Sequence, residues 1–328
     1  MTAVLASAAC RPSTVAEAES KHDVKWLDEN GTADAIAAIG RLADADSRAV
    51  AALEARSAFD GQAFVGAWEA VGRGAAWGAA LMHEGLADPR RADLAAAAIE
   101  GTEGRQAAFL DDLDGALVRL GASQQNVNVA SALASIGPVA HAAVVRRLAD
   151  ASTRTAMCRG IASPKADRDA RRALLEVPES ARDAGACVEA VVRIAADDDV
   201  ALAWVAERGE PGLLGAAGTS ALLPCPRLHW IWTKALSDRP ADVYAALKVP
   251  LGYAVKRCPA EMDGVLADAI VRLPLTHGVV VDAIDPFAAY DGALHATCAA
   301  LPAVAVGRDP LIVRERASDA LGHACKAL

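Results

Sequence analysis

The sequence has few aromatic residues and almost no segment typical of a β-strand. Phe, Trp and Tyr make up 4% of its 328 residues, although hydrophobic residues in total reach 53%. Much of the apolar content is Ala, which loses little side-chain entropy in a helix and lets helices approach closely. The best strand candidate, residues 278–282, is too short and isolated to found a sheet. We therefore predict an all-α fold.

The charge and hydropathy patterns also lack what two classes of partner require. The formal net charge is −9, and the basic residues are scattered rather than gathered into the positive surface that nucleic acid needs. No apolar run approaches the length of a membrane-spanning helix. The sequence thus predicts no nucleic-acid binding and no transmembrane span.

The common catalytic and metal-binding motifs are missing as well. Residues 72–78 are glycine-rich, but the third glycine comes one place too late for a dinucleotide fingerprint, so we interpret them as a turn. His83 lacks the second histidine of a zinc-protease helix, and no nucleophile elbow or phosphate-binding loop occurs. Residues 197–199 lack calcium-loop spacing and fit an acidic helix start. We expect no catalytic, cofactor-binding or metal-binding residues, no cofactor and no enzymatic activity.

The best-preserved segment, residues 32–57, contains two short helical patterns joined by a polar turn. Ile36, Ile39 and Leu42 mark the apolar face of the first helix, and Val50 and Leu53 mark that of the second. Neither helix is able to bury its stripe alone, so such a unit must stack on a neighbour of the same kind. This predicts an α-solenoid of stacked antiparallel helix pairs.

The same segment resembles the HEAT family, in particular the short bacterial HEAT-like repeats. Ile36, Ile39 and Leu42 fall where that family places its apolar stripe, and Gly40 falls where it places a small helix-packing residue. The resemblance implies an α-solenoid. It is clear in this unit and fades in later repeats, so the second half is expected to be irregular.

Turn residues mark the other helices along the chain. Thr14 and Glu17 form a capping box for a first helix that reaches about Asp28, and Gly31 ends it. Further helices are predicted over residues 62–71, 75–83, 88–99, 109–120, 128–136 and 139–148. We expect roughly eight to ten helix pairs, since such repeats span about 30–40 residues. The predicted organisation is a truncated signal and tether over 1–13, HEAT-like repeats over 14–208, and degenerate repeats over 209–328 that continue the same solenoid.

The N-terminus resembles the end of a bacterial lipoprotein signal peptide. Residues 5–9 are small or apolar and precede Cys10, which stands at the position that this family lipidates. The resemblance implies a lipid anchor on Cys10 and a place at the bacterial cell envelope, periplasmic or on the surface. The alternative is a cytoplasmic protein with an Ala-rich terminus and an incidental cysteine.

The six other cysteines follow one another at spacings close to one repeat. Consecutive cysteines could therefore face each other on adjacent helix pairs. In an exported chain, among fifteen pairings of six cysteines, we expect the disulfides Cys158–Cys187, Cys225–Cys258 and Cys298–Cys325. In a reduced protein the same residues would be small buried hydrophobes. No Cys-x-x-Cys occurs, so neither a zinc knuckle nor a thioredoxin-like site is indicated.

Aromatic residues and one histidine cluster in the second half of the chain. Trp and Tyr favour interaction hot spots, because they bury much area and keep a polar group. Two Trp residues two positions apart lie on different sides of a helix, so at least one is expected to point inward. A bulky piece of core is therefore the alternative to an interaction patch. The candidate patch consists of His229, Trp230, Trp232, Tyr244 and Tyr253.

These patterns lead to one functional expectation and two alternatives. We expect a non-enzymatic scaffold that presents a curved helical surface to a protein or peptide and is held at the envelope by a lipid anchor. One alternative is an enzyme on a helical array, either lyase-like or a toroid with an acidic pocket. The other is a cytoplasmic HEAT-like scaffold.

Overall fold

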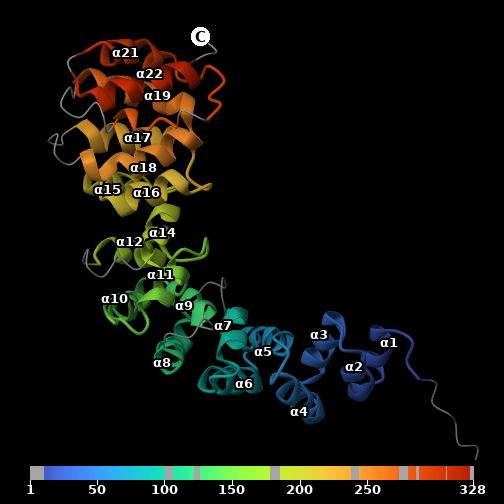
Figure 1. Cartoon of the computed structure of the whole chain (residues 1–328). Coiled ribbons are helices and arrows are strands. Elements are labelled where there is room, and N and C mark those ends of the chain that lie inside the picture. The colour runs from blue at the N-terminus through green and yellow to red at the C-terminus, as the bar shows by residue number, and fades with distance from the viewer. Residues whose placement is uncertain are drawn as a thin grey trace, which may run out of the picture. The chain divides into compact units, whose positions relative to one another are not determined.

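The computed structural model confirms the all-α fold (Figure 1). It describes residues 11–99, 106–121, 126–177, 185–237, 244–272, 280–285, 288–307 and 309–325. Within these ranges the chain forms twenty α-helices and no β-strand. This number of helices fits the expected eight to ten pairs.

The chain forms two compact units, Met1–Ala170 and Arg171–Leu328, which divide within one helix, α12 (Arg168–Leu175). The helices of the first unit are α1 (Val15–Ser20), α2 (Val24–Asn30), α3 (Ala33–Leu42), α4 (Ser47–Arg56), α5 (Gln62–Gly72), α6 (Ala76–Ala87), α7 (Ala92–Ile99), α8 (Leu110–Leu120), α9 (Val127–Ala134), α10 (His141–Ala149) and α11 (Arg154–Ile161). Those of the second unit are α14 (Gly185–Ile194), α15 (Asp199–Arg208), α16 (Pro211–Thr219), α17 (Cys225–Ser237), α18 (Tyr244–Arg257), α19 (Pro259–Arg272), α21 (His295–Ala305) and α22 (Leu311–His323).

Each unit is a stack of helix pairs. In the first unit α1, α3, α5, α7, α9 and α11 pack successively on one another, and partners such as α3 and α4 or α5 and α6 pack side by side (Figure 1). In the second unit α14, α16 and α18 form one row, and α15, α17, α19 and α21 form another. Each row repeats the same helix-on-helix contact, which is the arrangement that a solenoid-like fold requires.

Residues 32–57 form the predicted pair, α3 and α4. The Thr32 hydroxyl accepts from the Ala35 amide at 3.3 Å, and the Asp46 carboxylate accepts from the Arg48 amide at 2.9 Å, so each helix has a side-chain cap. Ile36, Ile39, Leu42 and Leu53 are buried, as the pattern predicts, whereas Val50 is only half-buried.

Gly40 is indeed a close-packing residue. A Cβ atom placed on it would lie 3.6 Å from the Cα atom of Gly66 on α5, so these two glycines let α3 and α5 approach backbone to backbone. Gly160 on α11 makes a tighter approach, because its Cβ atom would lie 2.5 Å from the carbonyl carbon of Ala130 on α9. Small residues thus determine how closely successive repeats stack.

The prediction of one continuous first helix to Asp28 is wrong. α1 ends at Ser20, and α2 begins at Val24 after His22 adopts φ +51°. Asp23 caps the new helix, since its carboxylate accepts from the Trp26 amide at 3.1 Å. The break follows from this second cap, which offers the backbone an alternative to continued helix. α2 ends as expected, with Gly31 in the left-handed conformation.

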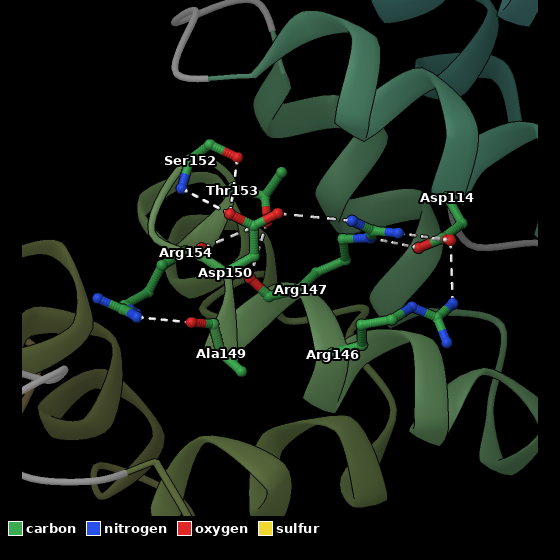
Figure 2. Close-up of polar contacts among 8 residues, drawn as sticks. All are labelled: Asp114, Arg146, Arg147, Ala149, Asp150, Ser152, Thr153 and Arg154. Carbon is green, nitrogen blue, oxygen red and sulfur yellow. Dashed lines mark hydrogen bonds and ion pairs between the residues drawn. The ribbon is translucent and has the colours of Figure 1, made fainter.

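Polar contacts recur between neighbouring repeats at nearly constant sequence separation. In Figure 2 the Asp114 carboxylate on α8 faces the guanidinium groups of Arg146 and Arg147 on α10. In six such contacts the separation falls between 28 and 35 residues, close to one repeat. They are Arg73–Asp44, Arg119–Leu86, Asn128–Asp93, Arg147–Asp114, Arg227–Asp199 and Thr297–Asp263.

In the part of the chain that the structure describes, no single helix is long and apolar enough to cross a membrane. One bent pair, Val127–Ala134 with Pro138–Ala149, meets the length and composition requirements together, with a bend of 119° between the two helices.

Candidate functional site at the first turns of α17 and α19

Two cysteines occupy equivalent positions at the starts of stacked helices. Cys225 is the first residue of α17, and Cys258 immediately precedes α19. The carbonyl of Cys258 accepts from the Met262 amide at 3.0 Å, so this residue is the N-cap of α19. Each cysteine is followed by a proline. Proline suits a first helical turn, because a backbone N–H at that position would have no intrahelical partner and its loss costs no hydrogen bond. Both sulfur atoms therefore lie near helix N-termini.

A disulfide joins these cysteines across one repeat. The Cα atoms of Cys225 and Cys258 are 5.7 Å apart, and the two residues are 33 positions apart in the sequence. Cys258 is buried, and Cys225 is partly exposed. A carboxylate oxygen of Glu261, on the first turn of α19, completes a group of three ligand-type atoms that lie within 4.8 Å of one another.

His229 connects the same two helices through a second contact. Its Nδ1 atom lies 2.6 Å from the carbonyl oxygen of Glu261. A carbonyl only accepts, so Nδ1 carries the proton and donates it. Nε2 then accepts from the Thr233 hydroxyl at 3.3 Å. The Nδ1 contact thus holds α17 against α19, and the Nε2 contact, which stays within α17, fixes the orientation of the ring.

Arg257 holds the segment that leads into α17. Its guanidinium donates to the Ala217 carbonyl at 3.1 Å and also to the carbonyls of Ser220 and Leu223. Burial lowers the pKa of Arg257 from its usual value. The side chain thereby satisfies carbonyls at the end of α16 and in the following turn, which fixes the approach to Cys225.

The structure separates the members of the predicted aromatic patch. Trp232 is fully buried and belongs to the core, and its indole N–H has no hydrogen-bond partner in the described part of the chain. Trp230 on α17 is 42% exposed and Tyr253 on α18 is 46% exposed. These two helices belong to different rows. The side chain of Tyr244 lies outside the described residues.

The remaining predicted cysteines are placed as follows. Cys298 on α21 is joined to Cys325, which follows α22, with Cα atoms 5.8 Å apart. Cys158 in the first unit and Cys187 in the second are fully buried, and their pairing stays a prediction. Cys10 lies outside the described residues.

Other sequence motifs have structural roles. Residues 73–75 form the turn between α5 and α6, where Gly74 has φ +78°, whereas Gly72 ends α5 and residues 76–78 of the predicted turn belong to α6. Asp198 is the N-cap of α15 and accepts from the Val200 amide at 2.8 Å, which agrees with an acidic helix start. Neither motif forms part of a ligand group in the described residues.

Sequence reasoning did not identify Glu261 as a neighbour of the cysteines. The three groups come from two adjacent repeats, so no local motif contains them. The repeated Cys-Pro at 225–226 and 258–259, one repeat apart, is a signal for the two cysteines but not for Glu261. Equivalent positions in successive repeats lie side by side in a stack.

Comparison with known proteins adds little to this description. No protein-family model matches the chain, and no curated protein matches its sequence. Among solved structures, the chain is similar to an engineered protein from the Northeast Structural Genomics Consortium, with 16% sequence identity and a TM-score of 0.32. That alignment covers 95% of this chain and 96% of the other. A likeness at this level carries no inference about function.

Proposed function

We propose that the protein is a non-enzymatic, HEAT-like scaffold that binds a protein or peptide segment through exposed aromatic side chains. The observation that carries this proposal is the exposure of Trp230 and Tyr253, at 42% and 46%, in a chain with 4% aromatic residues. Trp and Tyr supply large contact areas with a polar group and are enriched among residues that dominate binding energy.

Tyr253 is well placed to act as such an anchor. It lies four residues after Val249, which is 56% exposed, so the two side chains share one face of α18. Leu247, Leu251 and Ala254 are buried on the other faces. A Cβ atom on Gly218 of α16 would lie 3.0 Å from the Cβ of Tyr253, so close helix packing fixes the base of the tyrosine. A partner with an apolar helical segment fits this surface.

Photocrosslinking tests the binding proposal directly. A photoreactive phenylalanine analogue replaces Tyr253 in the full chain, expressed in its native cells. We expect one discrete adduct, which weakens when Val249→Ala, on the same face of α18, is added. The same analogue at Phe59, which is 73% exposed in the first unit, serves as the matched control. Equal yields of the same adducts from positions 59 and 253 would refute a specific surface.

We also propose that the scaffold is tethered by lipid on Cys10 at the bacterial cell envelope. Support comes from residues 5–10, which resemble a lipoprotein signal end, and from the number of cysteines, since disulfides persist in oxidising compartments. A tether would raise the local concentration of membrane-bound partners without tight contacts.

Intact mass and fractionation test the tether. The protein is expressed from its native chromosomal locus, and cells are fed a clickable fatty acid. We expect the label on the wild-type chain in the membrane fraction and its loss in Cys10→Ser. An unlabelled wild-type chain in the soluble cytosolic fraction would overturn this part of the proposal and leave the binding surface untouched.

A further inference from the structure

We propose that reduction of the Cys225–Cys258 disulfide creates a zinc site formed by the two sulfur atoms and the Glu261 carboxylate. The three ligand-type atoms already lie within 4.8 Å of one another. Ligands bound to one tetrahedral zinc ion, at about 2.0–2.3 Å from the metal, lie about 3.3–3.8 Å apart. The two sulfurs are bonded to each other in the disulfide and must move apart to reach this spacing, which we expect rotation of the side chains to allow.

The ligand types select the metal. Two thiolates and one carboxylate suit Zn²⁺, which binds sulfur, nitrogen and oxygen ligands in tetrahedral sites. Calcium and magnesium prefer oxygen ligands only, so the two sulfurs disfavour them. Three protein ligands leave the fourth coordination position to water or to a donor from another molecule.

The surrounding fold favours the charged, metal-binding form of the cysteines. Cys225 begins α17 and Cys258 caps α19, so the positive ends of two helix dipoles stabilise both thiolates. His229 donates to the Glu261 carbonyl at 2.6 Å and thereby fixes the turn that carries the third ligand. Metal sites depend on this kind of outer contact for ligand orientation.

The disulfide state and the zinc-bound state interconvert by thiol–disulfide exchange with a small thiol compound. A dithiol transfers two electrons and two protons to the disulfide, so the protein S–S bond breaks and the reductant forms its own disulfide. Zinc binding then releases the two thiol protons. Oxidation by a disulfide compound reverses both steps and expels the metal. In either state α17 and α19 stay linked, once covalently and once through the ion.

The chain provides a matched comparison within the same unit. The Cys298–Cys325 disulfide has a similar Cα separation, 5.8 Å against 5.7 Å. In the described residues, Cys225, Cys258 and Glu261 form the one cluster of three ligand-type side chains. The Cys298–Cys325 disulfide therefore has no third ligand-type side chain beside it there. Reduction should therefore yield a zinc site at the first pair and none at the second.

Metal titration of the full chain tests the proposal. The protein is reduced with a phosphine, which is oxidised as water supplies the oxygen, and is then titrated with Zn²⁺ against a chromophoric chelator. Co²⁺ in place of Zn²⁺ reports thiolate ligands through its charge-transfer absorption. We expect wild type and the double variant C298S/C325S to bind zinc alike, and C225S/C258S to bind at least about 100-fold more weakly, as expected when ligands are removed.

Glu261→Gln keeps the proposal testable if the cysteine variants misfold. Glu261 is partly solvent-accessible, and the substitution keeps both cysteines. We expect about 10-fold weaker zinc binding with unchanged circular dichroism. Identical affinity of wild type and Glu261→Gln, or equal affinity of the oxidised and reduced wild-type chains, would overturn the site.

Discussion

The Asp114 carboxylate on α8 receives two hydrogen bonds from Arg147 on α10, at 2.7 and 3.0 Å, across a sequence separation of 33 residues (Figure 2). Arg146 adds a third hydrogen bond at 3.0 Å. Partial burial acts to raise the pKa of Asp114, but the hydrogen bonds from Arg147 and Arg146 outweigh it and hold that pKa below its usual value. The same contact raises the pKa of Arg147. A charged pair thus joins neighbouring repeats.

Asp114→Asn should weaken the first unit by about 2–3 kcal/mol. The side chains of Asp114 and Arg147 are 17% and 13% exposed, so the substitution leaves a largely buried guanidinium with only the more distant and more exposed Asp150, at 3.6 Å, as its counter-charge. Urea unfolding measured by circular dichroism gives the change. Glu29→Gln is the control, because its partner Arg11 is 75% exposed and such pairs contribute about 0–1 kcal/mol. Equal effects of the two substitutions would contradict this account.

Gly160→Ala should destabilise the stack by about 1–3 kcal/mol, because a methyl group there would meet the backbone of α9 at 2.5–2.6 Å. Backbone atoms are unable to move aside without separating two repeats. Gly264→Ala, in α19, is the matched control, since nothing lies within 4 Å of its Cβ position. It should be neutral or stabilising by up to about 1 kcal/mol. Thermal unfolding of both variants distinguishes close packing from helix propensity.

The helices that local patterns determine were predictable from the sequence. Ile36, Ile39 and Leu42 repeat at helical spacing, and Thr32 supplies the cap. The prediction of α3 therefore required no knowledge of the neighbouring helices. The break at His22 was missed because Asp23 caps a second helix there, and helical periodicity alone does not show that cap.

Of the candidate site, only the Cys225–Cys258 disulfide was predictable from the sequence. Repeat spacing places Cys225 opposite Cys258, whereas the proximity of Glu261 depends on which faces of α17 and α19 meet. The same limit applies to the tryptophans. Residues two apart on a helix point in different directions, so one of Trp230 and Trp232 was expected inside, but stacking decides that it is Trp232.

The start of α1 should be sensitive to acid through Glu17. Hydrogen bonds from the Lys21 side chain, the Ser13 amide and the Ser13 hydroxyl, at 2.6, 2.9 and 3.1 Å, lower the pKa of Glu17 from 4.5 to about 2. A lowered folded-state pKa means that the stabilisation is complete above 4.5 and is lost as the pH falls towards 2.

Carboxyl carbon shifts measured by NMR over this pH range test the Glu17 prediction. The wild-type carboxyl should titrate with its midpoint near 2. In Lys21→Met the midpoint should move up towards 4.5, because the largest contribution to the lowered pKa is removed. A wild-type midpoint that Lys21→Met leaves unchanged would show that this hydrogen bond does not control the titration.

Removal of the Cys298–Cys325 disulfide should destabilise the C-terminal end of the second unit by about 3–4 kcal/mol. The bond links Cys298 on α21 to Cys325, which follows α22, and closes a loop of 27 residues. This restricts the conformational freedom of the loop in the unfolded state. The double variant C298A/C325A should therefore unfold at lower denaturant concentration. Native-state hydrogen exchange should accelerate in α21 and α22 before α14 and α15, because each helix pair of a stack contacts only the neighbouring pairs. Uniform acceleration across the second unit would instead show that it unfolds as one cooperative body.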